Sequence, residues 1–168
     1  MRAGAVAIVA TLLVACSSQS IAPPTPSGTP ATHASVISSG CGSTPVLKGG
    51  IPKWLDVAGG YNNPSDLPYV ITHPQLAAGF LFVYPLQAGL GQDVPNKILW
   101  VVRTPRIGPL TIDGHPLGSP SPTVHDARPA NSGPGEIYPD GIKVPTPGCW
   151  QFDLRWASSH VQVELNYT

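Results

Sequence analysis

The sequence predicts an all-β fold, a sandwich of two sheets, for the part of the chain from Cys41 to Thr168. The chain of 168 residues contains 21 prolines and 18 glycines, charged residues make up only 11%, and no window keeps a helical period. Two stretches near the C-terminus, residues 150–156 and 161–167, alternate strictly between apolar and polar side chains. Because this alternation gives each strand one apolar face, a second layer must cover it.

The two alternating stretches predict a β-hairpin with its tip at residues 158–159. For both apolar faces to lie on one side, an even-numbered residue must face an odd-numbered one. The expected register therefore pairs Leu154 with Val163. The same register sets Asp153 opposite Glu164, which is unfavourable on a sheet unless a nearby cation offsets the two like charges.

Two continuous apolar runs are expected to form the central strands. Residues 79–85 and 97–103 are short and are bounded by Gly, Pro and Asn, which is typical of strands that are covered on both faces or that join two layers. The Asp-Gly pairs at 113–114 and 140–141 predict turns between weaker strands. Residues 72–78 predict one helical turn, because Thr72 or His73 can cap it and Pro74 takes the first helical position.

The N-terminal residues predict export and lipid anchoring. Arg2 precedes an apolar run from Ala3 to Val14 that is too short to span a bilayer, and the chain continues through Leu-Val-Ala to Cys16. This leader is similar to that of bacterial lipoproteins. The resemblance implies that residues 1–15 are a signal peptide, and that Cys16 carries the lipid that holds the protein on the extracytoplasmic side of the cell membrane.

Residues 16–40 predict a disordered tether between the lipid and the domain. They are rich in Ser, Thr, Pro and Ala and contain no charged residue, so that they cannot build a core. A proline-rich segment of this length extends on the order of 70 Å. The expected organisation is a signal peptide (1–15), a tether (16–40) and one β-sandwich domain (41–168).

Cys41 and Cys149 are predicted to form a disulfide. The chain has 3 cysteines, and lipidation of Cys16 leaves an even pair in a protein that matures outside the cytoplasm. Cys149 shares its parity with polar Gln151 and Asp153, so the bond is expected on the outer face or at an edge of the sandwich. No tyrosine lies two positions before Cys149, which argues against a true immunoglobulin domain.

A distinctive pattern comprises residues 96–103, 109–117 and 140–150, and its most specific part is Pro-x-Pro-Gly-Cys-Trp, which ends at Trp150. In this pattern the chain resembles a group of uncharacterised bacterial (actinobacterial) lipoproteins with an immunoglobulin-like β-sandwich. The resemblance spans residues 79–168. It implies the immunoglobulin-like fold and the extracytoplasmic location, and it brings no catalytic residue with it.

The sequence contains few candidates for chemistry. A formal net charge of zero without a basic cluster argues against a nucleic-acid partner, and no catalytic, cofactor or metal motif is present, so no cofactor is expected. Residues 118–135, rich in Ser, Pro and Gly, predict a long surface loop of the kind that carries binding sites. Trp54 is expected in the core, with a stacking platform for a sugar ring as the alternative.

Two classes of function remain. The first is a non-enzymatic binding or interaction module of the cell envelope, tethered through Cys16, with an envelope protein or a glycan as its ligand. The alternative is an envelope enzyme or metal-binding protein whose site lies at Asp113, His115, His125 and Asp126. The alternative requires these four side chains to converge in the folded domain.

Overall fold

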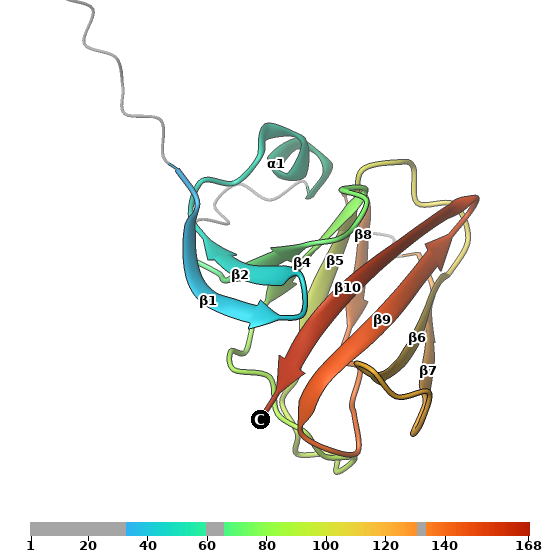
Figure 1. The fold of residues 1–168 in the computed structure, drawn as a ribbon. Helices are drawn as coiled ribbons and strands as arrows, with labels where there is room; N and C mark the ends of the chain where they lie inside the picture. The colour runs from blue at the N-terminus through green and yellow to red at the C-terminus, as the bar shows by residue number, and fades with distance from the viewer. Residues whose placement is uncertain (1–32, 60–65, 131–133) are drawn as a thin grey trace, which may run out of the picture. The chain divides into compact units, whose positions relative to one another are not determined.

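The structure is a computed structural model that describes residues 33–59, 66–130 and 134–168 (Figure 1). The elements of these residues are β1 (Ser35–Cys41), β2 (Thr44–Lys48), α1 (Lys53–Gly59), β3 (Tyr69–Ile71), β4 (Ala77–Leu81), β5 (Ile98–Val102), β6 (Leu110–Pro116), β7 (Val124–Arg128), β8 (Ile137–Asp140), β9 (Gly148–Trp156) and β10 (Ser159–Tyr167). The predicted signal peptide and residues 16–32 of the predicted tether lie outside the described residues. The domain begins before Cys41, because β1 already starts at Ser35.

The strands form two antiparallel sheets, which confirms the predicted all-β sandwich. The larger sheet has the strand order β1-β2-β3-β4-β5-β8, and the smaller sheet has the order β10-β9-β6-β7. The predicted run 97–103 contains the central strand β5, whereas the run 79–85 overlaps the central strand β4 only at residues 79–81, and residues 82–85 lie outside it. All of β4 is buried, because one of its faces packs in the sandwich and the other packs under α1.

The C-terminal hairpin, β9 with β10, follows the predicted alternation. Its inward-facing side chains, from Trp150 to Tyr167, are buried on both strands. The predicted register is wrong by two residues, because Leu154 pairs with Val161 and not with Val163. The connection is a tight loop at residues 157–158, which Ala157 closes with a positive φ of 46°. The parity of the pairing, which decides the buried face, is unchanged.

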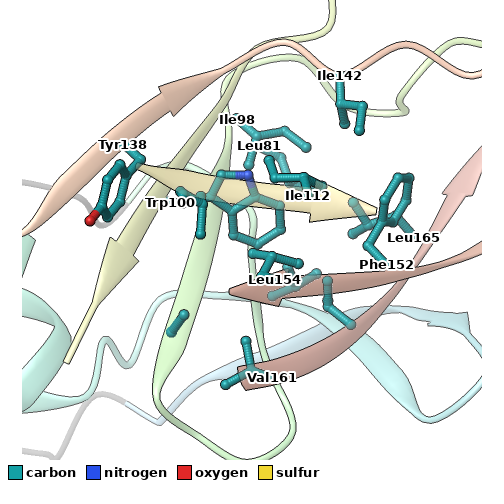
Figure 2. Packing of buried hydrophobic residues seen from close by; sticks show 14 of the residues in the cluster. Leu81, Ile98, Trp100, Ile112, Tyr138, Ile142, Phe152, Leu154, Val161 and Leu165 are labelled. Atoms are coloured by element: carbon teal, nitrogen blue, oxygen red, sulfur yellow. The ribbon is translucent and has the colours of Figure 1, made fainter. Parts of the chain in front are cut away.

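The main core lies between the two sheets. Figure 2 shows side chains of the larger sheet packed against those of the smaller sheet, among them Leu81, Ile98, Trp100, Ile112, Phe152, Leu154 and Leu165. Trp100 is fully buried, and its indole Nε1 donates a hydrogen bond of 3.2 Å to Asp140 Oδ2. The indole ring is therefore buried in an apolar environment, and its N–H group keeps a hydrogen-bond partner.

Gly79 of β4 makes room for this indole. A Cβ atom at Gly79 would lie 2.6 Å from Cζ3 of Trp100, its neighbour on β5. We expect Gly79→Ala to lower the free energy of unfolding by about 1–3 kcal/mol, the range typical of overpacking. Gly91→Ala is the matched control, because a Cβ there meets nothing within 4 Å. Equal denaturant midpoints for the two variants would contradict this packing.

Three local predictions are wrong. Thr72 does not begin a helical turn; its hydroxyl bridges the connection between β3 and β4, where it accepts a hydrogen bond of 3.0 Å from the Ala77 amide. The Asp-Gly pair at 113–114 lies within β6, because Gly114 leaves space for Phe152, whose ring would lie 2.4 Å from a Cβ. The predicted loop 118–135 contains strand β7, which pairs with β6.

The N-terminal hairpin of β1 and β2 is fastened to the C-terminal hairpin. Cys41 and Cys149 form the predicted disulfide, with 5.6 Å between their Cα atoms, and Cys149 lies on the outer side of β9 as its parity predicts. Beside the bond, the Thr44 hydroxyl donates to Glu164 of β10 and accepts 3.0 Å from the Glu164 amide. Glu164 therefore faces Thr44, and the predicted pairing of Glu164 with Asp153 is wrong, since Asp153 lies opposite Gln162.

Candidate functional site

A cleft of about 780 Å³ lies where α1 meets the ends of two strands of the larger sheet. Its walls come from α1, from the segment after β5 and from the segment before β8. The lining residues are Lys53, Trp54, Val57, Ala58, Arg103, Pro105, Gly135 and Glu136. Figure 1 shows α1 on the side of the larger sheet away from β9 and β10, so the cleft lies outside the main sandwich.

Helix α1 is held on the sheet by one of its faces. Pro52 precedes the helix, and its carbonyl accepts hydrogen bonds from the amides of Leu55 and Asp56, at 2.9 and 3.1 Å. Leu55 is fully buried in a second apolar cluster on the outer face of the larger sheet. The spacing of Trp54 and Val57 places them together on an adjacent face of the helix, which forms the apolar wall of the cleft.

Two cations border this apolar wall. The guanidinium of Arg103 lies over the indole of Trp54, with 5.7 Å between Cζ and the ring centroid. Neither Arg103 nor Lys53 forms a side-chain hydrogen bond or ion pair with the residues that the structure describes. By contrast, Arg128 and Arg155 each form ion pairs with carboxylates. The cleft therefore combines an aromatic surface with two positive charges that have no anionic partner within the described chain.

The opposite wall is fixed by main-chain hydrogen bonds. The Glu136 amide donates 2.7 Å to the Ala58 carbonyl, and the Val102 amide donates 2.8 Å to the Glu136 carbonyl. The Glu136 carboxylate accepts a hydrogen bond of 2.5 Å from the Arg106 amide. Gly135 has a φ of 91°, and a Cβ there would lie 2.6 Å from the Gly59 carbonyl oxygen, so only glycine fits this approach of the wall to α1.

The sequence predicts Trp54 in the core, and the structure places it only half-buried, at the edge of the second cluster and in the cleft wall. The chain's other tryptophans, Trp100, Trp150 and Trp156, are fully buried. Lys53 and Arg103 carried no recognisable signal, because they are far apart in the sequence and only the fold brings them together. The one available sign was Trp54 itself, for which the sequence left a stacking platform open as the alternative to the core.

The four residues of the alternative site do not converge. Asp113 and His125 face each other across β6 and β7, with 2.6 Å between Oδ1 and Nδ1. His115 lies on the same face, where its Nδ1 is 3.0 Å from the Pro116 carbonyl oxygen, whereas Asp126 points to the other side of β7 and binds Arg128. Among the described residues, no group of three or more His, Cys, Asp or Glu side chains is placed to hold a metal ion.

Asp113 instead belongs to a row of charges on the outer face of the smaller sheet. Arg155 bridges it to its cross-strand neighbour Asp153, at 2.9 Å from Asp113 and 4.0 Å from Asp153, and His160 lies 2.6 Å from Asp153. Partial burial opposes ionisation of Asp153. Hydrogen bonds from His160 and Gln162 and the charges of His160 and Arg155 outweigh it and hold the pKa of Asp153 below its usual value.

Asp140 is a buried carboxylate beneath Arg128. The Arg128 Nε donates 3.0 Å to Oδ1, and Trp100 donates to Oδ2. Burial raises the pKa of Asp140, although hydrogen bonds from Trp100 and the Gly141 amide and the charge of Arg128 act in the opposite direction. Because the folded state holds this proton more tightly than the unfolded chain, ionisation of Asp140 costs stability, and the cost disappears as the pH falls through the folded pKa towards the unfolded value.

This predicts a pH dependence for Asp140→Asn. The difference in unfolding free energy between the variant and the wild type should favour the variant more at pH 7 than at pH 3, where Asp140 is protonated in both states. Denaturant unfolding of both proteins at the two pH values measures this difference, and the effects of all other acids largely cancel. If the difference is constant or shifts towards the wild type at neutral pH, the pKa of Asp140 is not raised.

Comparison with known proteins finds no matching family model, no similar curated protein and no similar solved structure. Within the described residues, no helix is long and apolar enough to cross a membrane.

Proposed function

We propose that the chain is an extracytoplasmic lipoprotein, held at the cell membrane by a lipid on Cys16, whose immunoglobulin-like β-sandwich acts as a non-enzymatic binding module of the cell envelope. Its binding site is the cleft beside α1. The observation that carries this proposal is the combination, in one cleft, of the partly exposed Trp54 with Lys53 and Arg103, two cations that have no ion-pair partner among the described residues. Ligand sites typically combine apolar walls with a few polar groups in this way.

The arrangement of the side chains favours binding over catalysis. In the cleft, the carboxylate of Glu136 is engaged by the Arg106 amide, and the lining holds no nucleophile with an adjacent base. Asp113 and His125 do form a close pair, but it lies on a sheet face among solvated ion pairs, at 47% and 67% side-chain exposure. Such exposed ion pairs contribute little to stability. An exposed pair on a sheet face also does not exclude water, as a catalytic site usually does.

Anchoring is tested by Cys16→Ser. We expect the variant to leave the membrane fraction and to remain soluble after detergent-free lysis, because it lacks the thiol that would carry the anchoring lipid. Replacement of Ser17 by Ala is the matched control and should stay with the membrane. Equal partitioning of both variants would show that Cys16 is not the anchor.

Binding is tested with the soluble Cys16→Ser chain and isolated envelopes of the native cell. We expect the chain to sediment with the envelopes, and a second substitution, Trp54→Ala, to reduce this retention at least several-fold. Leu117→Ala is the control, because Leu117 is 42% exposed and does not line the cleft. If Trp54→Ala and Leu117→Ala bind equally, the cleft is not the binding site.

A further inference from the structure

We propose that the cleft beside α1 recognises a saccharide ring that carries one carboxylate group. This inference rests on the proposed function, since it names the ligand class of the same site. Three properties of the cleft support it: the balance of its charges, the shape and chemistry of its apolar wall, and the hydrogen bonds that the main chain of Glu136 already makes.

The charges of the cleft match a single negative charge. Lys53 and Arg103 contribute two positive charges and Glu136 one negative charge, so the lining residues carry a net charge of plus one. The Glu136 carboxylate is already bound by the Arg106 amide. A monoanionic ligand would therefore neutralise the site, and its carboxylate would find Lys53 and Arg103 as donors without displacing an existing ion pair.

Stacking prepares Arg103 to bind a carboxylate. Its guanidinium lies over the Trp54 ring, which limits the orientations of the group and leaves its N–H donors without protein partners among the described residues. A planar guanidinium donates in its own plane and matches the two oxygens of a carboxylate. A stacked arginine of this kind loses less conformational freedom on binding than a free one, which favours recognition of a small ligand.

The apolar part of the cleft matches one face of a sugar ring. Val57 is 71% exposed on α1, and with Trp54, Ala58 and Pro105 it forms an open apolar surface. The axial C–H groups of a pyranose give it an apolar face that packs on such surfaces, while its hydroxyls stay in water. An acyl chain would gain less here, because in an open cleft much of its length would remain exposed to solvent.

A peptide strand fits the cleft less well than a ring. Strand addition needs unpaired main-chain groups, but the Glu136 amide and carbonyl are already paired with Ala58 and Val102. Recognition at the Glu136 wall must therefore use side chains. A ring with one charged substituent needs only an apolar surface and cationic donors, and the described lining provides both.

The probes for the test are N-acetylmuramic acid and N-acetylglucosamine, which share a ring and differ in the lactyl carboxylate. Acrylamide quenching of tryptophan fluorescence in the full chain reports on Trp54, because Trp100, Trp150 and Trp156 are fully buried. We expect N-acetylmuramic acid to protect Trp54 from quenching, and N-acetylglucosamine to do so at least tenfold more weakly. A Trp54→Phe variant should lose the quenchable signal.

Charge variants identify the donors. Arg103→Gln should weaken protection by N-acetylmuramic acid about tenfold, in line with the loss of one charge-assisted hydrogen-bond pair. Lys53→Gln should weaken it several-fold. Lys48→Gln is the control and should have no effect, since Lys48 is exposed, does not line the cleft and has no ion-pair partner among the described residues.

Each other outcome overturns the inference in an identifiable way. Equal protection by the two sugars would show that the carboxylate does not contribute to recognition. Unchanged binding by Arg103→Gln and Lys53→Gln would show that these cations do not bind the ligand. No protection by either sugar would exclude the ligand class. In all three cases the proposed function stands if Trp54→Ala still reduces retention on envelopes at least several-fold, so the two failures are distinguishable.

Discussion

Reduction of the Cys41–Cys149 disulfide is expected to lower the free energy of unfolding by about 4 kcal/mol. The bond joins residues 108 apart, so it closes nearly the whole domain, and the chain-entropy model gives about 4.7 kcal/mol for a loop of about 100 residues. It also holds β1 of the larger sheet to β9 of the smaller one. The two hairpins share few other attachments, the main one being Thr44 with Glu164.

Denaturant unfolding of the oxidised and reduced chain measures this effect. The Cys16→Ser background removes the third thiol, and the double variant Cys41→Ser/Cys149→Ser should unfold like the reduced protein. In the unfolded, unreduced chain both cysteines should resist alkylation. A loss of less than about 1 kcal/mol would mean that the contacts around Thr44 and Glu164, and not the covalent bond, hold the N-terminal hairpin.

Trp100→Ala is expected to destabilise the domain by about 3–5 kcal/mol, the range for removal of a large buried aromatic side chain. Trp100 lies between the two sheets, and its loss leaves both a cavity and the buried Asp140 without one of its donors (Figure 2). Trp54→Ala is the matched control. Because Trp54 is only half-buried beside the cleft, its loss should cost about 1 kcal/mol or less.

The same tryptophan should couple to Gly79. Since the space above Gly79 is occupied by the Trp100 ring, the Gly79→Ala substitution should cost little in a Trp100→Ala background. Thermal or denaturant unfolding of the two single variants and the double variant gives the coupling energy. Additive effects would show that Gly79 is required for another reason.

Much of the fold was predictable because it follows from the local alternation of apolar and polar residues along the strands. The period of two at residues 150–156 and 161–167 fixed the buried face of β9 and β10, and the parity of Cys149 placed the disulfide on the outer side. These predictions need only the geometry of a strand. They do not depend on which residue faces which across the hairpin.

The details that failed depend on contacts between distant residues or on unusual backbone. Ala157 closes the tight loop of the C-terminal hairpin with a positive φ, a conformation that the sequence signals only when Gly or Asn is present. The Asp-Gly pair at 113–114 resembles a turn, but Gly114 is needed to admit the Phe152 ring within a strand. The roles of Ala157 and Gly114 cannot be predicted from the sequence, because they depend on residues that only the fold brings next to them.

The candidate site was less predictable than the fold. Helix α1 has seven residues, too few to show a helical period in a chain dominated by Pro and Gly. The partners of Trp54 in the cleft, Arg103 and Glu136, come from strand ends far along the chain. The predicted candidates, Asp113 with His125, meet because β6 and β7 pair, but both side chains are largely exposed on a sheet face.

Photo-crosslinking from the cleft tests whether the cleft beside α1 binds an envelope component. A benzoylphenylalanine replaces Val57, which is exposed on α1 in the cleft wall, in the full chain in its native cell, and a second chain carries it at Leu117 as the control. We expect an envelope adduct from position 57 that is absent or much weaker from position 117 and is lost when Trp54→Ala is added. Adducts of equal yield from both positions, or none from position 57, would show that the cleft is not the binding site.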